Sequence, residues 1–287
     1  MFTTLITVDQ LAAAAAHGAD QPRDWLSIDC RFDLAKPDAG AAAYAAGHIP
    51  NALYAHLDRD LSSPITANSG RHPLPSPAAF AATVAAWGVT AQTQVVAYDA
   101  DTGVYAARLW WLLRWVGHRR VAVLDGGLRA WCAQGLALTA QAPAARTPSD
   151  FRAVPDDALW LDTPTVATRA GAVDYCLLDA RAPERFSGAI EPIDPIAGHV
   201  PGARNLPFAT SLDSNARFLT PAQLHAQIGA RQAGVADSHT IAMCGSGVTA
   251  CHVLLAMEVA GKPGARLYAG SWSEWIRDPH RPIATGS

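Results

Sequence analysis

The chain repeats its own sequence pattern once, and this repeat limits the folds that it can adopt. The residues Gly-His-Ile-Pro-Asn-Ala at 47–52 return as Gly-His-Val-Pro-Gly-Ala at 198–203. Upstream, Ile-Asp-Cys-Arg at 28–31 matches Leu-Asp-Ala-Arg at 178–181, and a third match follows downstream in the same order. The interval is far longer than the roughly 20–50 residues of solenoid repeats. We therefore predict two copies of one domain.

A segment rich in alanine, proline, serine and threonine separates the two copies. It runs from 139 to 157 and contains three prolines. Because proline fixes φ and has no N–H, these residues favour an extended linker over a helix. We expect a first domain at 1–140, a linker at 141–157 and a second domain at 158–287.

Within each copy, short β-rich runs alternate with helical stretches rich in alanine and leucine. A strand–helix–strand order is typical of a parallel sheet with helices on both faces. The sequence therefore predicts an α/β fold with two tandem domains, each a parallel sheet flanked by helices. The clearest elements are strands at 25–28, 95–98, 121–124, 175–178, 240–243 and 266–268, and helices at 105–116 and 250–260.

Charge and cysteine usage exclude several classes of function. The formal net charge is -3 and no basic stripe is visible, so a nucleic-acid partner is not expected. The five cysteines form no CxxC pair, which argues against a disulfide scaffold and against a structural zinc site. The ten histidines show no ligand spacing, so we predict neither a metal nor any other cofactor.

The ends and the apolar runs carry no targeting or membrane signal. The first basic residue is Arg23, so Met1 to Asp20 lacks the basic region of a secretory signal. The longest uncharged run, 240–257, is interrupted by Gly-Ser-Gly and is better explained by a strand, a loop and a helix. We expect a soluble protein without a membrane partner in a reducing compartment, the cytoplasm.

The strand expected at 240–243 leads into a loop suited to a reactive thiol. Cys244 is followed by Gly245, Ser246 and Gly247, and a helix is expected to begin nearby. The glycines permit positive φ, so that successive amides can point inward, and the helix N-terminus adds partial positive charge. A thiol at this place is expected to react as a thiolate, and the same loop can hold an anion.

The loop Cys-Gly-Ser-Gly-Val-Thr-Ala at 244–250 resembles the active-site loop of the rhodanese superfamily, most closely that of 3-mercaptopyruvate sulfurtransferases. The resemblance extends to Tyr98-Asp99, to both Gly-His-(Ile/Val)-Pro segments and to 270–275. It implies tandem rhodanese domains with an inactive first copy that supports the structure and walls one side of the cleft. The repeat agrees, because Asp99 stands where the second copy has Cys244 and a carboxylate cannot carry a transferable sulfur.

The resemblance also implies an activity. A sulfurtransferase moves a sulfur from a small donor to the cysteine as a persulfide, and then to a thiol or cyanide acceptor. A thioredoxin-like reductant is one such partner. The loop residues expected to hold the sulfur or the donor are Gly245, Ser246, Gly247, Val248 and Thr249.

The donor is predicted from the side chains around the cysteine. Enzymes that prefer thiosulfate often have basic residues after the cysteine, whereas Gly245 and Ser246 are neutral, which favours 3-mercaptopyruvate. Arg185 matches the first of two arginines that hold the donor in this family. The second is absent, because Glu-Pro-Ile-Asp-Pro at 191–195 holds no arginine. Thiosulfate therefore remains the alternative donor.

Other residues are weaker candidates. The resemblance places Asp179 and Arg181 behind the loop as an ion pair, His48 beside the cleft and Trp272 at its rim. For Ser246, a role in protonation and a role in shaping the loop both remain open. Cys251, two helical turns beyond Cys244, is more simply a packed residue than a redox partner.

Two other functions remain as remote alternatives. A Cys-based phosphatase needs an arginine six residues after its cysteine to grip phosphate. Here Ala250 occupies that position, which argues against the chemistry. A non-catalytic sulfur carrier would keep the loop without turning over a donor.

Overall fold

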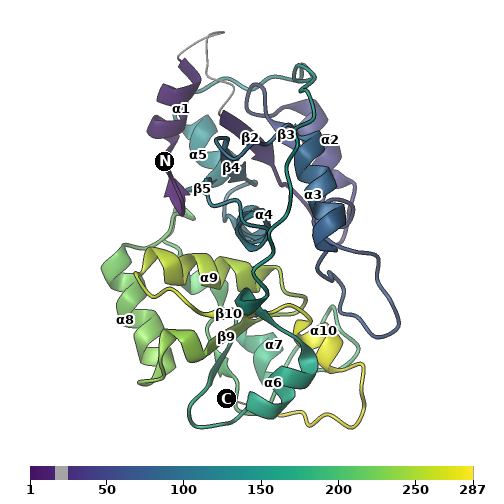
Figure 1. Ribbon diagram of the computed structural model, residues 1–287. Helices are drawn as coiled ribbons and strands as arrows, with labels where there is room; N and C mark the ends of the chain where they lie inside the picture. Colours follow the sequence, from purple (N-terminus) through teal and green to yellow (C-terminus); the bar gives the residue numbers. More distant parts are fainter. Residues whose placement is uncertain (17–24, 287) are drawn as a thin grey trace. The chain divides into compact units, whose positions relative to one another are not determined.

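The computed structural model describes residues 1–16 and 25–286 of the chain, shown in Figure 1. These residues form two compact units, which we call unit 1 and unit 2. Unit 1 consists of 1–63, 75–156 and 214–217. Unit 2 consists of 64–74, 157–213 and 218–287.

Unit 1 is built on a parallel sheet. Its described strands lie in the order β1-β5-β4-β2-β3, and every pair of neighbours is parallel. The strands are β1 (Leu5–Ile6), β2 (Trp25–Asp29), β3 (Leu53–Tyr54), β4 (Gln94–Tyr98) and β5 (Val121–Leu124). The helices are α1 (Val8–Ala16), α2 (Ala39–Ala46), α3 (Pro77–Ala86), α4 (Val104–Trp115) and α5 (Gly127–Ala133).

Unit 2 repeats this sheet. Its described strands lie in the order β6-β10-β9-β7-β8, which is the order of unit 1 strand for strand. The strands are β6 (Trp160–Leu161), β7 (Cys176–Asp179), β8 (Arg204–Asn205), β9 (Thr240–Met243) and β10 (Arg266–Tyr268). The α-helices are α6 (Thr163–Arg169), α7 (Pro183–Ser187), α8 (Pro221–Gln232), α9 (Thr249–Val259) and α10 (Ser271–Trp275). Short 3-10 turns lie at Asp157–Leu159, Phe208–Ser211 and Asp237–His239.

The predicted fold class is confirmed in both units. The strands expected at 121–124, 240–243 and 266–268 have the observed bounds. Those expected at 25–28 and 95–98 are each one residue longer at one end, and the one expected at 175–178 begins and ends one residue later. The helices expected at 105–116 and 250–260 each begin and end one residue earlier. None of the described helices is long and apolar enough to cross a membrane.

The central strands β4 and β9 show why the alternation of strands and helices could be predicted from the sequence. Every residue of both strands is buried, so each strand appears in the sequence as an apolar run bounded by loop residues. Both strands end at the carboxyl edge of their sheet, where parallel α/β folds place their ligands. Asp99 follows β4 and Cys244 follows β9.

The segment expected as a linker lies against unit 1. Val154 and Asp156 donate their backbone N–H groups to Val116 O and Trp115 O, and Ser149 donates to Ala85 O. Between Leu138 and Asp156 the structure describes neither a helix nor a strand, apart from an isolated bridge at Thr139. The predicted domain bounds stay a prediction.

A second long loop, residues 64–74 between β3 and α3, packs within unit 2. The Gly70 N–H donates to Glu274 Oε2 (3.2 Å) and the Arg71 N–H donates to Ser273 Oγ (3.1 Å). Arg277 Nε donates to Ser69 O at 3.2 Å. A Cβ on Gly70 would lie 2.7 Å from Gly270 O, so the two backbones approach closely. The loop is thus fixed to α10 of unit 2.

The loop after β4 shows what this strand-to-helix turn can bind. The buried carboxylate of Asp99 accepts the N–H groups of Gly103 (2.9 Å) and Tyr105 (2.9 Å) at the start of α4. The N–H groups of Asp101 and Ala106 approach it at 3.2 and 3.4 Å. Burial raises the pKa of Asp99, and the amides of Gly103, Tyr105 and Ala106 oppose that rise. In unit 1 the loop is therefore filled by its own side chain.

We expect removal of this carboxylate to destabilise unit 1. Asp99→Ala leaves the buried amides without an acceptor and should lower the free energy of unfolding by about 3 kcal/mol. Asp99→Asn keeps one acceptor oxygen and should lose less. Asp101→Ala, in the same loop but with a side chain 38% exposed, is the matched control. Equilibrium urea unfolding measures all three variants, and equal stability of wild type and Asp99→Ala would contradict the account.

Candidate active site

Cys244 lies at the carboxyl end of β9 and is enclosed by the loop that follows it. Its side chain is almost fully buried, with 2% of the residue exposed. The Gly247 N–H donates to Cys244 Sγ at 3.1 Å, just before α9 begins at Thr249. This contact corresponds to the one that Gly103 makes with Asp99 in unit 1. An amide and a helix N-terminus thus face the thiol, as the sequence predicts.

Gly247 is required by the shape of the loop. Its φ is +78°, and a Cβ at this position would lie 2.5 Å from the carbonyl oxygen of Ala269. Its own carbonyl accepts from the thiol of Cys251 at 3.3 Å, which gives the buried Cys251 a packing role in the loop. Only glycine combines this backbone conformation with the close approach.

The start of α10 holds the outer side of the loop. The Cys244 N–H donates to Ser271 Oγ (3.0 Å), while the N–H groups of Trp272 and Ser273 donate to Cys244 O and Gly245 O (3.0 and 2.9 Å). Ser271 itself has φ +53° and is fully buried. These bonds hold the backbone on either side of the thiol in one position.

The expected place of Trp272 at an open rim is wrong, because its ring is fully buried. Its indole Nε1 donates to Ile196 O at 2.9 Å, and the guanidinium of Arg181 lies 4.9 Å from the ring centroid. Trp272 therefore acts on the loop through its backbone bond to Cys244 and through packing.

Arg185 is directed toward the loop by two buried carboxylates. Its Nε donates to Glu191 Oε1 (3.0 Å) and its Nη2 donates to Asp194 Oδ2 (3.0 Å). The Nη1 atom lies 3.4 Å from the point where a Cβ on Gly245 would stand. Burial works against ionisation of Glu191, yet Arg185 and the amides of Asp194 and Ile193 bring the pKa of Glu191 below its usual range. The arginine is thus held beside Cys244 with donors left for a ligand.

Two residues that the sequence analysis did not single out also reach this loop. His72 is buried, and its Nδ1 lies 2.7 Å from Ser246 Oγ in a hydrogen bond. Arg71 forms an ion pair with Asp194. Both come from the 64–74 loop, and His72 lies 174 residues before Ser246 in the sequence. The only local signal is an Arg-His pair in a loop with one glycine and two prolines, which is too common to be predictive.

Two ion pairs recur at equivalent places in the two units. Arg181 forms a forked ion pair with Asp179 and donates to Gly198 O at 2.8 Å. Arg31 does the same with Asp29 and donates to Gly47 O at 2.7 Å. Because Asp99 and not a cysteine follows the central strand β4 of unit 1, the shared pair indicates a structural role in holding the Gly-His turn. The predicted role of Asp179 and Arg181 as an ion pair that supports the active loop from behind stays a prediction.

The histidines of the two Gly-His turns, His48 and His199, also make equivalent contacts in the two units. The Nδ1 of His48 lies 2.8 Å from Tyr44 O and its ring stacks on that of Tyr44. The Nδ1 of His199 lies 2.8 Å from Phe186 O and its ring stacks on that of Phe186. Both contacts lie within one unit. They assign a structural role to His48, and its place beside a donor stays a prediction.

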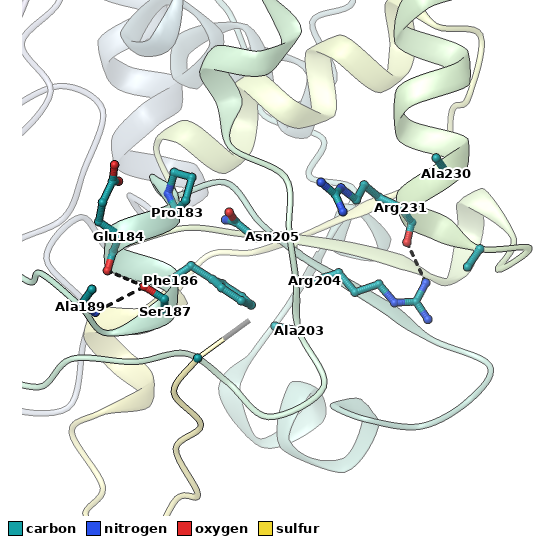
Figure 2. A pocket seen from close by; sticks show the side chains of 12 residues that line it. Pro183, Glu184, Phe186, Ser187, Ala189, Ala203, Arg204, Asn205, Ala230 and Arg231 are labelled. Carbon is teal, nitrogen blue, oxygen red and sulfur yellow. Dashed lines mark hydrogen bonds between the residues drawn. The ribbon is translucent and has the colours of Figure 1, made fainter.

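A cavity of unit 2 lies away from the thiol. It has a volume of about 740 Å³ and lies between α7, β8 and the end of α8 (Figure 2). Phe186, Ala203 and Asn205 line it, and Arg204 donates to the carbonyl of Arg231 at 2.7 Å. Cys244 is not among the lining residues, so the cavity does not mark the reactive centre. No group of three His, Cys, Asp or Glu side chains among the described residues is placed to hold a metal ion.

Comparison with known proteins identifies the fold and the class of enzyme. The model of the rhodanese family, described as "Rhodanese-like domain", matches this chain twice, at residues 7–134 and 163–278. A probable 3-mercaptopyruvate sulfurtransferase of Pseudomonas aeruginosa is 51% identical over 284 residues, which is 98% of each chain. A putative thiosulfate sulfurtransferase of Mycobacterium tuberculosis, SseB, is 40% identical over 96% of this chain and 97% of that one.

A solved structure supports the same fold and the same class of enzyme. SseA of Escherichia coli, described as a 3-mercaptopyruvate sulfotransferase with the rhodanese fold, superposes with a TM-score of 0.80 at 30% identity. The match covers 95% of this chain and 100% of SseA. The predicted resemblance and enzyme class are confirmed. The chain belongs to the rhodanese-like family and is a sulfurtransferase.

Proposed function

We propose that the protein takes a sulfur atom from 3-mercaptopyruvate, holds it as a persulfide on Cys244 and passes it to a thiol or to cyanide. The observation that carries the proposal is the enclosure of Cys244 Sγ by a loop whose Gly247 N–H already points at it. The P. aeruginosa relative bears the name of this donor. The SseB relative is named for thiosulfate, which makes thiosulfate the second candidate.

The first half-reaction transfers the sulfur to the enzyme. The Cys244 thiolate attacks the sulfur of the donor, an S–S bond forms and the C–S bond of the donor breaks. The electron pair of the C–S bond stays on carbon, which leaves as the enolate of pyruvate. That carbon must gain a proton to give pyruvate, while the new persulfide loses the proton of the donor thiol.

The His72–Ser246 pair is suited to carry this proton. Ser246 follows Cys244 by two residues, and its hydroxyl is hydrogen-bonded to the imidazole of His72, a side chain that commonly serves as general acid or base. Thiosulfate makes no such demand, because its leaving group is sulfite and no carbon needs protonation. The pair therefore supports 3-mercaptopyruvate over thiosulfate.

The second half-reaction regenerates the thiolate. An acceptor thiolate or cyanide attacks the outer sulfur, the S–S bond to Cys244 breaks and its electron pair returns to Cys244. A thioredoxin-like reductant is an acceptor of the right chemistry. The cytoplasm is the compartment that we propose, because it supplies such thiols and keeps Cys244 reduced.

The ratio of the two donors tests the proposed substrate. We expect kcat/KM for 3-mercaptopyruvate to exceed that for thiosulfate by about tenfold or more. Cys244→Ser should lose turnover with both donors, whereas Cys251→Ser should keep it because its thiol only packs against the loop. Steady-state assays with a common thiol acceptor give the ratio. A preference for thiosulfate would show that the second candidate is correct.

The role of the His72–Ser246 pair is separately testable. We expect His72→Asn and Ser246→Ala to lower kcat with 3-mercaptopyruvate by about 100-fold, the usual size of a lost proton-transfer group. Turnover with thiosulfate should change far less, because sulfite needs no proton. His280→Asn is the control, since this side chain is 88% exposed. An equal loss with both donors would instead show that the pair only shapes the loop.

A further inference from the structure

We propose that Arg71 is a second donor-binding residue, which together with Arg185 grips the carboxylate and the neighbouring keto oxygen of a 2-oxo acid. The inference rests on the proposed function and names a residue that the family pattern does not supply. Its basis is the meeting of two guanidinium groups at one point beside Cys244.

The two guanidinium groups converge on Gly245. Arg71 Nη2 lies 2.8 Å from the point where a Cβ on Gly245 would stand, and Arg185 Nη1 and Nη2 lie 3.4 and 3.5 Å from the same point. Gly245 directly follows the reactive cysteine. A side chain at this position would fill the space in which the two arginines meet. Glycine therefore allows both guanidinium groups to lie this close to the loop that follows the cysteine.

Asp194 holds both arginines in this arrangement. Its Oδ1 forms the ion pair with Arg71 Nη1, and its Oδ2 accepts from Arg185 Nη2. The Asp194 side chain is 3% exposed, and its own N–H donates to Glu191 Oε1 at 3.0 Å. The buried Asp194 carboxylate thus binds Arg71 through Nη1 alone and fixes the orientation of the guanidinium, including its other N–H donors. Arg71 Nε is buried without a hydrogen-bond partner in the described structure.

The charges at this place suit a monoanion. Arg71, Arg185 and Arg181 face the carboxylates of Asp194, Glu191 and Asp179, three charges of each sign, so the cluster has no formal excess charge. A compact dianion such as thiosulfate gains little from it. A planar carboxylate beside a C=O group can instead accept directed N–H bonds from two guanidinium groups. Each guanidinium presents paired, coplanar N–H donors, which an ammonium does not.

Arg71 also restores what the sequence lacks. Family members carry a second arginine shortly after the position of Arg185, and this chain has Ile193 and Asp194 there. Asp194 instead binds an arginine that lies 123 residues earlier in the chain. The backbone of Arg71 is fixed to Ser273, and the next residue is His72, which bonds to Ser246. Arg71 would thus bind the carboxylate of the donor, while its neighbour His72, through Ser246, would supply the proton to the leaving carbon of the same donor.

The test separates the two half-reactions. In a ping-pong enzyme, kcat/KM for the donor reports only the first half, and kcat/KM for the acceptor reports only the second. We expect Arg71→Gln to lower kcat/KM for 3-mercaptopyruvate by about 10- to 100-fold, the effect of losing a charged hydrogen bond. The value for a neutral thiol acceptor such as dithiothreitol should stay unchanged. Arg71→Lys should recover only part of the loss.

Arg231→Gln, an exposed arginine on α8, is the control and should match wild type in both halves. An Arg71→Gln variant with unchanged kcat/KM for the donor would overturn the inference while leaving the proposed function intact. An equal fall in both halves would also overturn it, because it would mean general damage to the loop. A wild-type enzyme without turnover of 3-mercaptopyruvate would overturn the inference and the proposed donor together.

Discussion

The difference between the two units depends on which side chain occupies the loop at the carboxyl end of the central strand, β4 in unit 1 and β9 in unit 2. In both units a buried strand enters a turn in which at least one backbone N–H points at the side chain that follows the strand, close to the start of a helix. In unit 1 the group is the Asp99 carboxylate, which accepts the Gly103 N–H at 2.9 Å. In unit 2 it is Cys244 Sγ, which accepts the Gly247 N–H at 3.1 Å. The same turn thus satisfies itself in one copy and presents a reactive sulfur in the other.

This shared turn explains how much of the fold the sequence reveals. The repeat predicts two copies of one domain, and the two sheets have the same strand order. Fully buried strands such as 240–243 stand out because parallel strands are apolar on both faces. Cys244 was identifiable because glycine, which the turn requires at Gly247, stands three residues after a cysteine at a strand end. These features are local, so the sequence carries them directly.

The rest of the site depends on contacts between distant segments. Arg71 and His72 lie in an irregular loop of the first repeat, yet they bond to Asp194 and Ser246 in unit 2. No periodicity marks such a loop, and its placement is decided by close packing of Gly70 on Gly270. Trp272 shows the same limit, because its motif is recognisable whereas its burial beneath Arg181 follows from tertiary packing alone.

The central claim is that Cys244 carries the sulfur between donor and acceptor. Intact-protein and peptide mass measurement after mixing the enzyme with 3-mercaptopyruvate, in the absence of any acceptor, tests this most directly. The account predicts that one sulfur atom is added to the peptide containing Cys244, together with one equivalent of pyruvate, and that a thiol then removes it. Release of pyruvate without added mass on Cys244, or addition at another cysteine, would contradict the account.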